Sequence, residues 1–227
     1  MISQRDASEA MIQPQRGQPL VVGTRRTHRK FLPAAAVARA LLIVIALVAC
    51  PTAFGQTRVY LLRGWFGVFS TGMDTIAEEL RAKGIKADAI GHLEWKSTAA
   101  KIAADRAAGA TGLLVLIGHS QGGNNVIDMA RELEKQSIPV DLLVTVAPFM
   151  QEPVPSNVVR AINYYQSPGW GSPLVAEPGF KGQLSNVNVA EDPAIVHINM
   201  DKDPKIQAQI VGAITGLANN VSQQVTR

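Results

Sequence analysis

Cysteine is almost absent from this chain of 227 residues, which contains only Cys50. A single thiol cannot form an internal disulfide, so the fold must be held by a packed core rather than by covalent cross-links. The sequence also lacks the Cys/His clusters that bind zinc and the acidic loops that bind calcium. We therefore expect a protein without a metal ion or another cofactor.

A basic surface is missing from most of the chain, although the net charge is +4. Residues 1–50 contain seven of the 22 Lys and Arg residues and two of the 18 Asp and Glu residues. From Pro51 onward 15 basic residues accompany 16 acidic ones, so the body of the protein is nearly neutral. The charge pattern gives no reason to expect a nucleic-acid partner.

The long hydrophobic run of a membrane span is also missing. The run ALLIVIALVA at 40–49 has ten residues and follows the basic segment RRTHRKF, an order that is typical of a signal peptide. The small residues Ala53 and Gly55 predict cleavage before Gln56. The sequence LVAC permits a second interpretation, a bacterial lipoprotein signal in which Cys50 carries the lipid. An uncleaved anchor or a buried helix is the third.

These features predict a leader and signal peptide over residues 1–55. The protein is then exported, either to the periplasm or into the medium. Association with a membrane is expected only if Cys50 is lipidated.

Short apolar runs alternate with amphipathic stretches from Arg58 onward. The apolar runs predict strands at 58–62, 85–90, 112–118, 139–147, 158–166 and 185–191. The amphipathic stretches predict helices at 72–84, 94–109, 120–136 and 203–220, the last with Asp203 as N-cap and Pro204 at its first position. Residues 167–182 are rich in Pro and Gly and are expected to be irregular.

This alternation predicts an α/β fold, with a doubly wound, mostly parallel sheet and helices on both faces. Right-handed crossovers then place the carboxyl ends of the strands along one edge, where a functional site is expected.

The motif Gly118-His119-Ser120-Gln121-Gly122 stands between the third strand and the third helix. It matches G-x-S-x-G, in which small residues allow a strained turn that holds a serine hydroxyl away from the backbone. The hydroxyl lies at the N-terminus of a helix, whose free N–H groups favour developing negative charge. We therefore predict that Ser120 is a nucleophile. A structural turn in a protein without activity is the alternative.

A nucleophilic serine needs a base, and a histidine that follows it in the chain usually supplies one. Of the four histidines, His28 and His92 precede the serine, and His119 is its immediate neighbour. Only His197 follows Ser120, between the last strand region and the last helix, so we predict that His197 is the base. A buried histidine beside the last helix is the alternative.

The oxyanion of an acyl-transfer intermediate needs two N–H donors. One is expected from Gln121, the residue after the nucleophile, and the other from Trp65 in the loop RGWFGVFSTG after the first strand. The side chains of Trp65, Phe66 and Phe69 could form the floor of a pocket for an apolar acyl group, although these aromatics could also belong to the core.

Three segments between about Arg58 and Asn220 resemble those of the α/β-hydrolase superfamily, specifically its small lipase- and esterase-like members without a cap domain. RGWFG is similar to the His-Gly-x-x-Gly oxyanion loop of bacterial lipases, with Arg63 in place of the histidine. GHSQGG is similar to their nucleophile elbow, and HINMDKDPKIQAQIVGAI to their histidine loop and final helix. The resemblance implies one α/β-hydrolase domain over residues 56–227 that hydrolyses a small-molecule or lipid-like ester or thioester through an acyl-serine.

The chain departs from that family at the acid of the triad. Many relatives have an Asp after the fourth strand, where this sequence has Ala147. The segment NYYQSPGWGSP after the next strand has no carboxylate. Glu152 is the nearest alternative, and Gln166 or a backbone carbonyl could orient the histidine instead. The remaining carboxylates in this part of the chain are Glu177, Glu191 and Asp192, followed by Asp201 and Asp203 beyond the histidine.

Three hypotheses about function remain open, and the absent acid motivates the second. The first is a serine esterase or lipase-like hydrolase. The second is a weak or inactive hydrolase-fold protein that serves as a binding module. The third is a structural lipoprotein that is anchored through Cys50.

Overall fold

The computed structural model describes residues 55–225 of the chain. The apolar run at 40–49 and Cys50 lie outside this range, so the predictions made for them concern residues that the structure does not describe. Within the described range, no helix is both long and apolar enough to cross a membrane.

Six strands form one sheet in which every neighbouring pair is parallel. Their spatial order is β2-β1-β3-β4-β5-β6, so the direction of winding reverses after β2. The predicted fold class, a doubly wound α/β sheet, is confirmed. The strands are β1 (Arg58–Arg63), β2 (Lys86–Gly91), β3 (Leu114–His119), β4 (Leu142–Val146), β5 (Arg160–Tyr165) and β6 (Gln183–Asn188).

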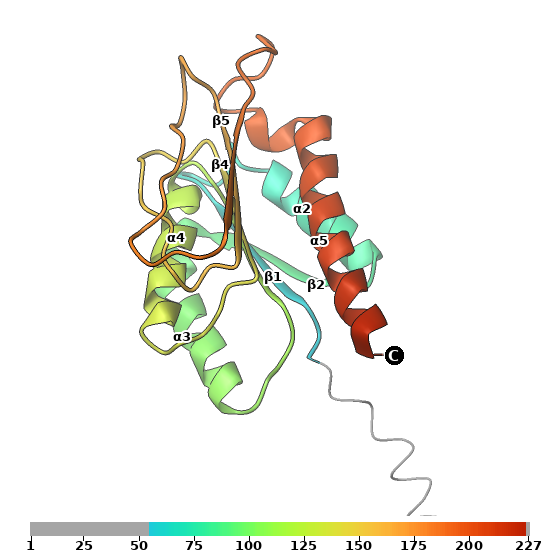
Figure 1. Ribbon diagram of the computed structural model, residues 1–227. Coiled ribbons are helices and arrows are strands. Elements are labelled where there is room, and N and C mark those ends of the chain that lie inside the picture. Colours follow the sequence, from blue (N-terminus) through green and yellow to red (C-terminus); the bar gives the residue numbers. More distant parts are fainter. Residues whose placement is uncertain (1–54, 226–227) are drawn as a thin grey trace, which may run out of the picture. The chain divides into compact units, whose positions relative to one another are not determined.

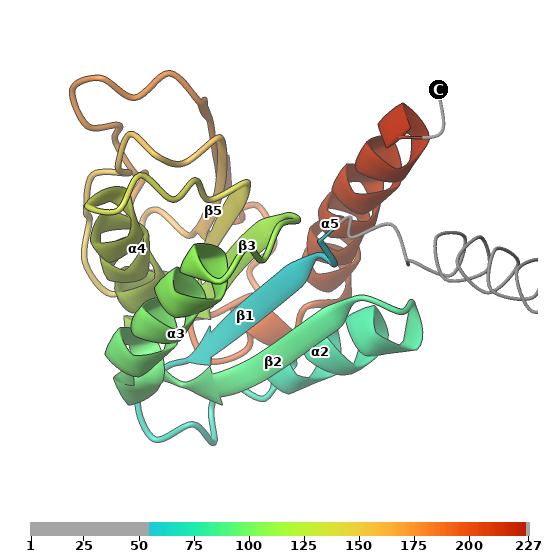
Figure 2. The ribbon, with the colours of Figure 1, turned by 90° about the horizontal axis from the view of Figure 1, so that it is seen from below.

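Helices cover both faces of the sheet (Figures 1 and 2). Helices α2 (Gly72–Ala82) and α5 (Pro204–Val225) lie on one face, and α3 (Trp95–Ala107) and α4 (Gln121–Glu134) lie on the other. Successive side chains of a strand point to opposite faces, so Val59 and Leu61 of β1 join the first layer of core while Tyr60 and Leu62 join the second. Every residue of β3 is buried, as its unbroken apolar run predicts.

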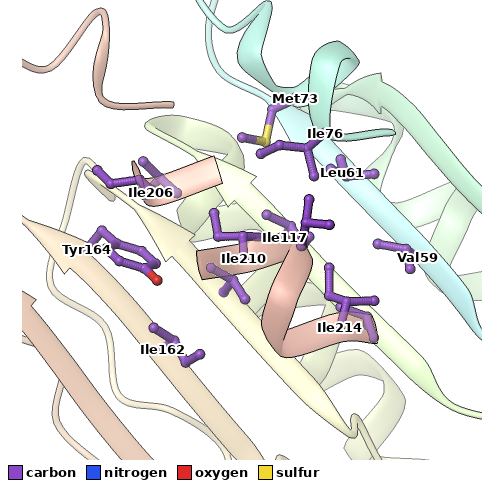
Figure 3. Close-up of a cluster of buried hydrophobic side chains, with 14 of the residues drawn as sticks. Val59, Leu61, Met73, Ile76, Ile117, Ile162, Tyr164, Ile206, Ile210 and Ile214 are labelled. Carbon is purple, nitrogen blue, oxygen red and sulfur yellow. The ribbon is translucent and has the colours of Figure 1, made fainter. Parts of the chain in front are cut away.

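Helix α5 packs a row of isoleucines against the sheet (Figure 3). Ile206, Ile210 and Ile214 recur every four residues, which places them on one helix face, and all three are buried in the same cluster as β1 and β3. Burial of each such side chain contributes about 1.5–3 kcal/mol. Asp203 caps the helix as expected, because its Oδ1 accepts hydrogen bonds from the N–H groups of Lys205 and Ile206.

Most element boundaries lie within a few residues of the expectation, and the largest differences are at β4, β6 and α5. Strand β6 begins at Gln183 rather than Ser185, because it is an edge strand with mostly exposed side chains and its bounds follow from pairing with β5. Helix α5 continues beyond Asn220 to Val225. Residues 167–182 contain no helix or strand, as expected, apart from an isolated bridge between Ala176 and Val154.

The carboxyl ends of the strands carry the loops of interest. Gly64 follows β1, Ser120 follows β3, and His197 lies in the long connection between β6 and α5, just before the short 3₁₀ helix η2 (Met200–Lys202). A second 3₁₀ helix, η1 (His92–Glu94), follows β2. Because all strands are parallel, these loops meet at one edge of the sheet.

Candidate active site

Ser120 occupies a strained turn between β3 and α4. Its backbone has φ 57° and ψ −123°, a region that residues with a side chain rarely adopt. The turn is anchored by a hydrogen bond of 2.9 Å from the N–H of Ser120 to the carbonyl of Val146. Such strain persists only where the surrounding structure enforces it, and it clusters at functional sites.

Two glycines make this turn possible. A Cβ atom on Gly118 would lie under 3.0 Å from the carbonyl oxygen of Gly122, and one on Gly122 would lie equally close to the carbonyl oxygen of Leu62 in β1. Helix α4 therefore begins directly against the sheet, with the hydroxyl of Ser120 at its N-terminus.

His197 lies beside Ser120, 77 residues away in the sequence. Its Nε2 atom is 2.9 Å from the Oγ of Ser120, which is hydrogen-bond distance. The structure thus brings together the two residues that the sequence predicted as nucleophile and base. Burial, and then the neighbouring His119, lower the pKa of His197 to about 4, so the imidazole is neutral at pH 7 and can accept the hydroxyl proton.

The loop after β1 lies against the serine. A Cβ atom on Gly64 would be 2.9 Å from the Cβ of Ser120, so only glycine allows this approach. The next residue, Trp65, and Gln121 have N–H groups that no hydrogen bond among the described residues uses. Both predicted oxyanion donors therefore border Ser120 in the chain or in space, with free N–H groups.

Arg63 and Ser70 hold this loop in place. The guanidinium of Arg63 donates to both carboxylate oxygens of Asp74 in α2, and this contact lowers the pKa of Asp74. The hydroxyl of Ser70 accepts the N–H of Gly64 at 2.9 Å. Arg63, which stands where the resembled family has histidine, thus ties the loop to the first helix.

A cavity of about 200 Å³ opens onto Ser120 and His197. Trp65, Phe66 and Phe69 line it as expected, and they are half-exposed or more, so they are not core residues. The ring centroids of Trp65 and Phe149 lie 5.1 Å apart. The other lining residues are Gly64, Ser70, His119 and Ile198.

A larger hollow of about 500 Å³ lies elsewhere, beside Arg58 and Lys101. It is near the amino end of β1, whereas Ser120 is at the carboxyl edge of the sheet. Its lining includes neither Ser120 nor a histidine. The smaller cavity is therefore the one that belongs with the serine.

The structure does not bring Glu152 to His197. Glu152 forms an ion pair of 2.6 Å with Arg131 and accepts a hydrogen bond from Asn124. This ion pair joins α4 to the loop after β4 and occupies the carboxylate of Glu152. The order of residues in the sequence did not reveal the pairing. Ala147, at the position where many relatives have Asp, is buried and has φ 45°.

No other carboxylate in the part of the chain that the structure describes bonds His197 in place of the missing acid. Among the described residues, the Nδ1 atom of His197 is buried without a hydrogen-bond partner. Gln166, the other orienting candidate, donates to the carbonyl of Ile195 rather than to the imidazole. The remaining carboxylates do not bond it either: Glu177 pairs with Arg131, and Asp192 accepts the N–H of Ala194.

His119 is a site residue whose role the sequence did not reveal. Its Nε2 lies 2.8 Å from the carbonyl oxygen of His197, and its Nδ1 lies 2.8 Å from the hydroxyl of Ser70. Since a carbonyl only accepts, Nε2 carries the proton, and Ser70 donates to Nδ1. Burial lowers the pKa of His119 to about 4, which fits this neutral tautomer.

Asp201 lies near the Nδ1 atom of His119, the ring atom that Ser70 bonds. It is fully buried, and its Oδ2 accepts the N–H of Gly72, while its Oδ1 is 3.9 Å from the Nδ1 of His119. Burial raises the pKa of Asp201 to about 6. Among the described residues, no group of three or more His, Cys, Asp or Glu side chains is arranged to hold a metal ion.

Comparisons with known proteins give a distant likeness in fold. No protein-family model matches the chain, and no curated protein matches it. Among solved structures, the fold is similar to that of a protein from Xanthomonas campestris pv. campestris described as "a putative hydrolase of the alpha/beta superfamily". The two are 14% identical with a TM-score of 0.40, over 70% of this chain and 98% of the other.

Proposed function

We propose that this protein is a serine hydrolase of the α/β-hydrolase type that cleaves a carboxylic ester or thioester. The observation that carries the proposal is the hydrogen bond of 2.9 Å between Ser120 and His197, at a turn with φ 57°. A serine on a strained turn, paired with a neutral imidazole, is the arrangement that activates a hydroxyl for attack on a carbonyl carbon.

In the first half of the proposed reaction, the Oγ of Ser120 attacks the acyl carbon while Nε2 of His197 takes its proton. The N–H groups of Gln121 and Trp65 receive the oxyanion, and the N-terminus of α4 adds a favourable dipole. His197 then gives its proton to the departing alcohol or thiol. In the second half, water attacks the acyl-serine, His197 takes the proton of the water and returns it to Ser120, and the acid is released.

The Nδ1 of His197 has no hydrogen-bond partner, and this should lower the rate of the proposed reaction. In a complete triad the carboxylate fixes the tautomer and stabilises the imidazolium, and loss of that function lowers kcat by about four orders of magnitude in a serine protease. We therefore expect slow turnover by this protein rather than none, because the nucleophile and the oxyanion donors do not depend on the acid.

The test uses a fluorophosphonate probe and an activated short-chain ester on the wild type, Ser120→Ala and His197→Ala. We expect the wild type to be labelled and to turn over, and both variants to lose labelling and hydrolysis. The matched control is Ser97→Ala, since Ser97 is an exposed serine whose hydroxyl bonds the carbonyl of Glu94. Equal labelling of the wild type and Ser120→Ala would contradict the proposal.

A binding module without activity is the second candidate, and the unpartnered Nδ1 of His197 is the observation that favours it. On that hypothesis the wild type remains unlabelled at long incubation, and hydrolysis equals the uncatalysed rate across acyl chain lengths. The same two assays therefore decide between the candidates.

The proposal for localisation is export, with cleavage before Gln56. A mature N-terminus at Gln56, found by mass spectrometry of the periplasm or the medium, would support it. Incorporation of labelled fatty acid into the wild type, and not into Cys50→Ser, would favour the lipoprotein instead.

A further inference from the structure

Trp170 lies against the imidazole of His197. The two ring centroids are 4.6 Å apart, with an angle of 36° between the ring planes. Trp170 belongs to the irregular connection between β5 and β6, and half of its surface is exposed. One part of the indole therefore covers the histidine while another part meets solvent.

Hydrogen bonds hold this contact in place from both sides. The N–H of Gln166 donates to the carbonyl of Trp170 at 2.8 Å, and the side chain of Gln166 donates to the carbonyl of Ile195 at 2.7 Å. Ile195 stands two residues before His197. Gln166 thus connects the backbone that carries the indole to the backbone that carries the imidazole, so their approach is built into the fold.

The charged and titratable groups around His197 do little to stabilise its protonated form. His119, with its ring centroid 5.2 Å away, is neutral at pH 7, and Lys202 adds a positive charge that acts on His119. Asp201 is turned to the N–H of Gly72, and Asp74 is paired with Arg63. No carboxylate among the described residues bonds the imidazole. The face of an indole carries negative electrostatic potential, which attracts a cation within about 6 Å of the ring centroid.

We propose that Trp170 stabilises the protonated form of His197 through a cation–π contact, in place of the carboxylate of a complete triad. Trp170 is then a positioning residue that acts through His197. Its consequence for catalysis rests on the proposed function, whereas the contact itself exists in the free protein. Such a contact should raise the pKa of His197 by about 0.5–1 unit relative to the same site without the π face.

Simple truncation of Trp170 would not test this, because removal of the indole also admits water, which favours the imidazolium. Fluorination of the ring weakens the negative potential of its face with little change in shape. The test therefore uses the full chain with Trp65→Phe and Trp95→Phe, so that Trp170 is the only tryptophan, grown with tryptophan, 5-fluorotryptophan or tetrafluorotryptophan. The protonated fraction of His197 is read from its ring C–H shifts between about pH 2.5 and 8, a range that reaches below its pKa, with the signals assigned by comparison with His197→Gln.

We expect the fraction of protonated His197 at pH 4 to fall stepwise with fluorination, several-fold in the tetrafluoro protein, and kcat at pH 7 to fall up to about ten-fold. The matched control keeps Trp95 instead, with Trp65→Phe and Trp170→Phe, because Trp95 packs on the other face of the sheet. Fluorination of Trp95 should leave the titration of His197 unchanged. A titration of His197 that does not respond to fluorination of Trp170 would overturn the proposal.

The two proposals fail in different ways. If the fluorophosphonate probe labels Ser120 but the titration of His197 does not change on fluorination of Trp170, the inference about Trp170 is wrong and the hydrolase proposal stands. If His197 responds to fluorination but Ser120 is never labelled, the contact is real and the hydrolase proposal is wrong.

Discussion

The Nε2 of His119 donates a hydrogen bond of 2.8 Å to the backbone carbonyl of His197. The next residue, Ser120, bonds the side chain of the same histidine. Two consecutive residues at the end of β3 therefore hold the backbone and the ring of His197. On its other side His119 accepts from Ser70, which in turn accepts the N–H of Gly64, so one buried histidine links the loops after β1, β3 and β6.

This link predicts a defect when Ser70 is replaced. Ser70→Ala leaves the N–H of Gly64 and the Nδ1 of His119 without partners in a buried place. Loss of such a partner costs about 1–3 kcal/mol. Because Gly64 positions the N–H of Trp65, we expect kcat for ester hydrolysis to fall about ten-fold or more, with little change in KM.

His119→Gln and His119→Asn separate the two contacts of that histidine. A glutamine amide can still donate to the carbonyl of His197, while an asparagine can still accept from Ser70. We expect the glutamine variant to retain more activity, since it keeps the bond to the histidine loop. Equal kcat in both variants and the wild type would mean that the link has no part in the reaction.

The second prediction concerns the glycines of the turn. A Cβ on Gly122 would meet the backbone of Leu62, so Gly122→Ala forces α4 away from the sheet and should destabilise the protein by about 1–3 kcal/mol. Gly212 in α5 is the matched control, because nothing lies within 4 Å of its would-be Cβ. Gly212→Ala should stabilise by about 0.5–1 kcal/mol. Urea unfolding of both variants measures the two effects, and similar signs would contradict the packing described for the turn.

Most of the fold could be predicted because its signals are local. The apolar run of β3 shows burial on both faces, and the glycine pattern after it indicates the turn at Ser120. Strand β6 begins and ends before the predicted range of 185–191, because an edge strand buries little and its bounds depend on a partner that is distant in the chain. His197 could be found by elimination, since no other histidine follows the serine.

The surroundings of His197 could not be predicted in the same way. The contact of Ser70 with His119 joins residues 49 apart, and neither residue stands in a motif that would pair them. Trp170 lies in a segment rich in Pro and Gly. This segment has no hydrophobic periodicity from which its path could be predicted. Glu152 was the nearest carboxylate in sequence, but its partner Arg131 on α4 takes it elsewhere.

The third prediction is an unusually wide pH range for activity. Burial and the neighbouring His119 lower the pKa of His197 to about 4, so the imidazole stays neutral well below pH 6. The values of kcat/KM, and the rate of probe labelling, should be nearly constant from pH 5 to 8 and should fall as the pH drops through about 4. A profile with its midpoint near 6.5, the usual pKa of histidine, would show that His197 is not the group that titrates or is not buried as described.

The last prediction concerns Asp201, whose pKa is raised by burial to about 6. A carboxyl with a pKa near 3.8 in the unfolded chain and about 6 in the folded one binds its proton more tightly when folded. Its contribution to stability is therefore fully present below about pH 4 and is lost as the pH rises through 6. Asp201→Asn removes the ionisation but keeps an oxygen that can accept the N–H of Gly72. We expect the variant to be more stable than the wild type at pH 7, by up to about 3 kcal/mol.

The gain in stability of Asp201→Asn over the wild type should shrink steadily between pH 6 and pH 4. Both buried histidines have lowered pKa values, so they remove stability as the pH falls below 6.5, and both are present in the two proteins. The difference in free energy of unfolding between variant and wild type therefore isolates Asp201. Asp88→Asn, at an exposed position on β2, is the control and should leave the stability unchanged across the range. If Asp201→Asn destabilises the protein at pH 7, the carboxylate has a charged partner in the folded state and its burial is not the dominant effect.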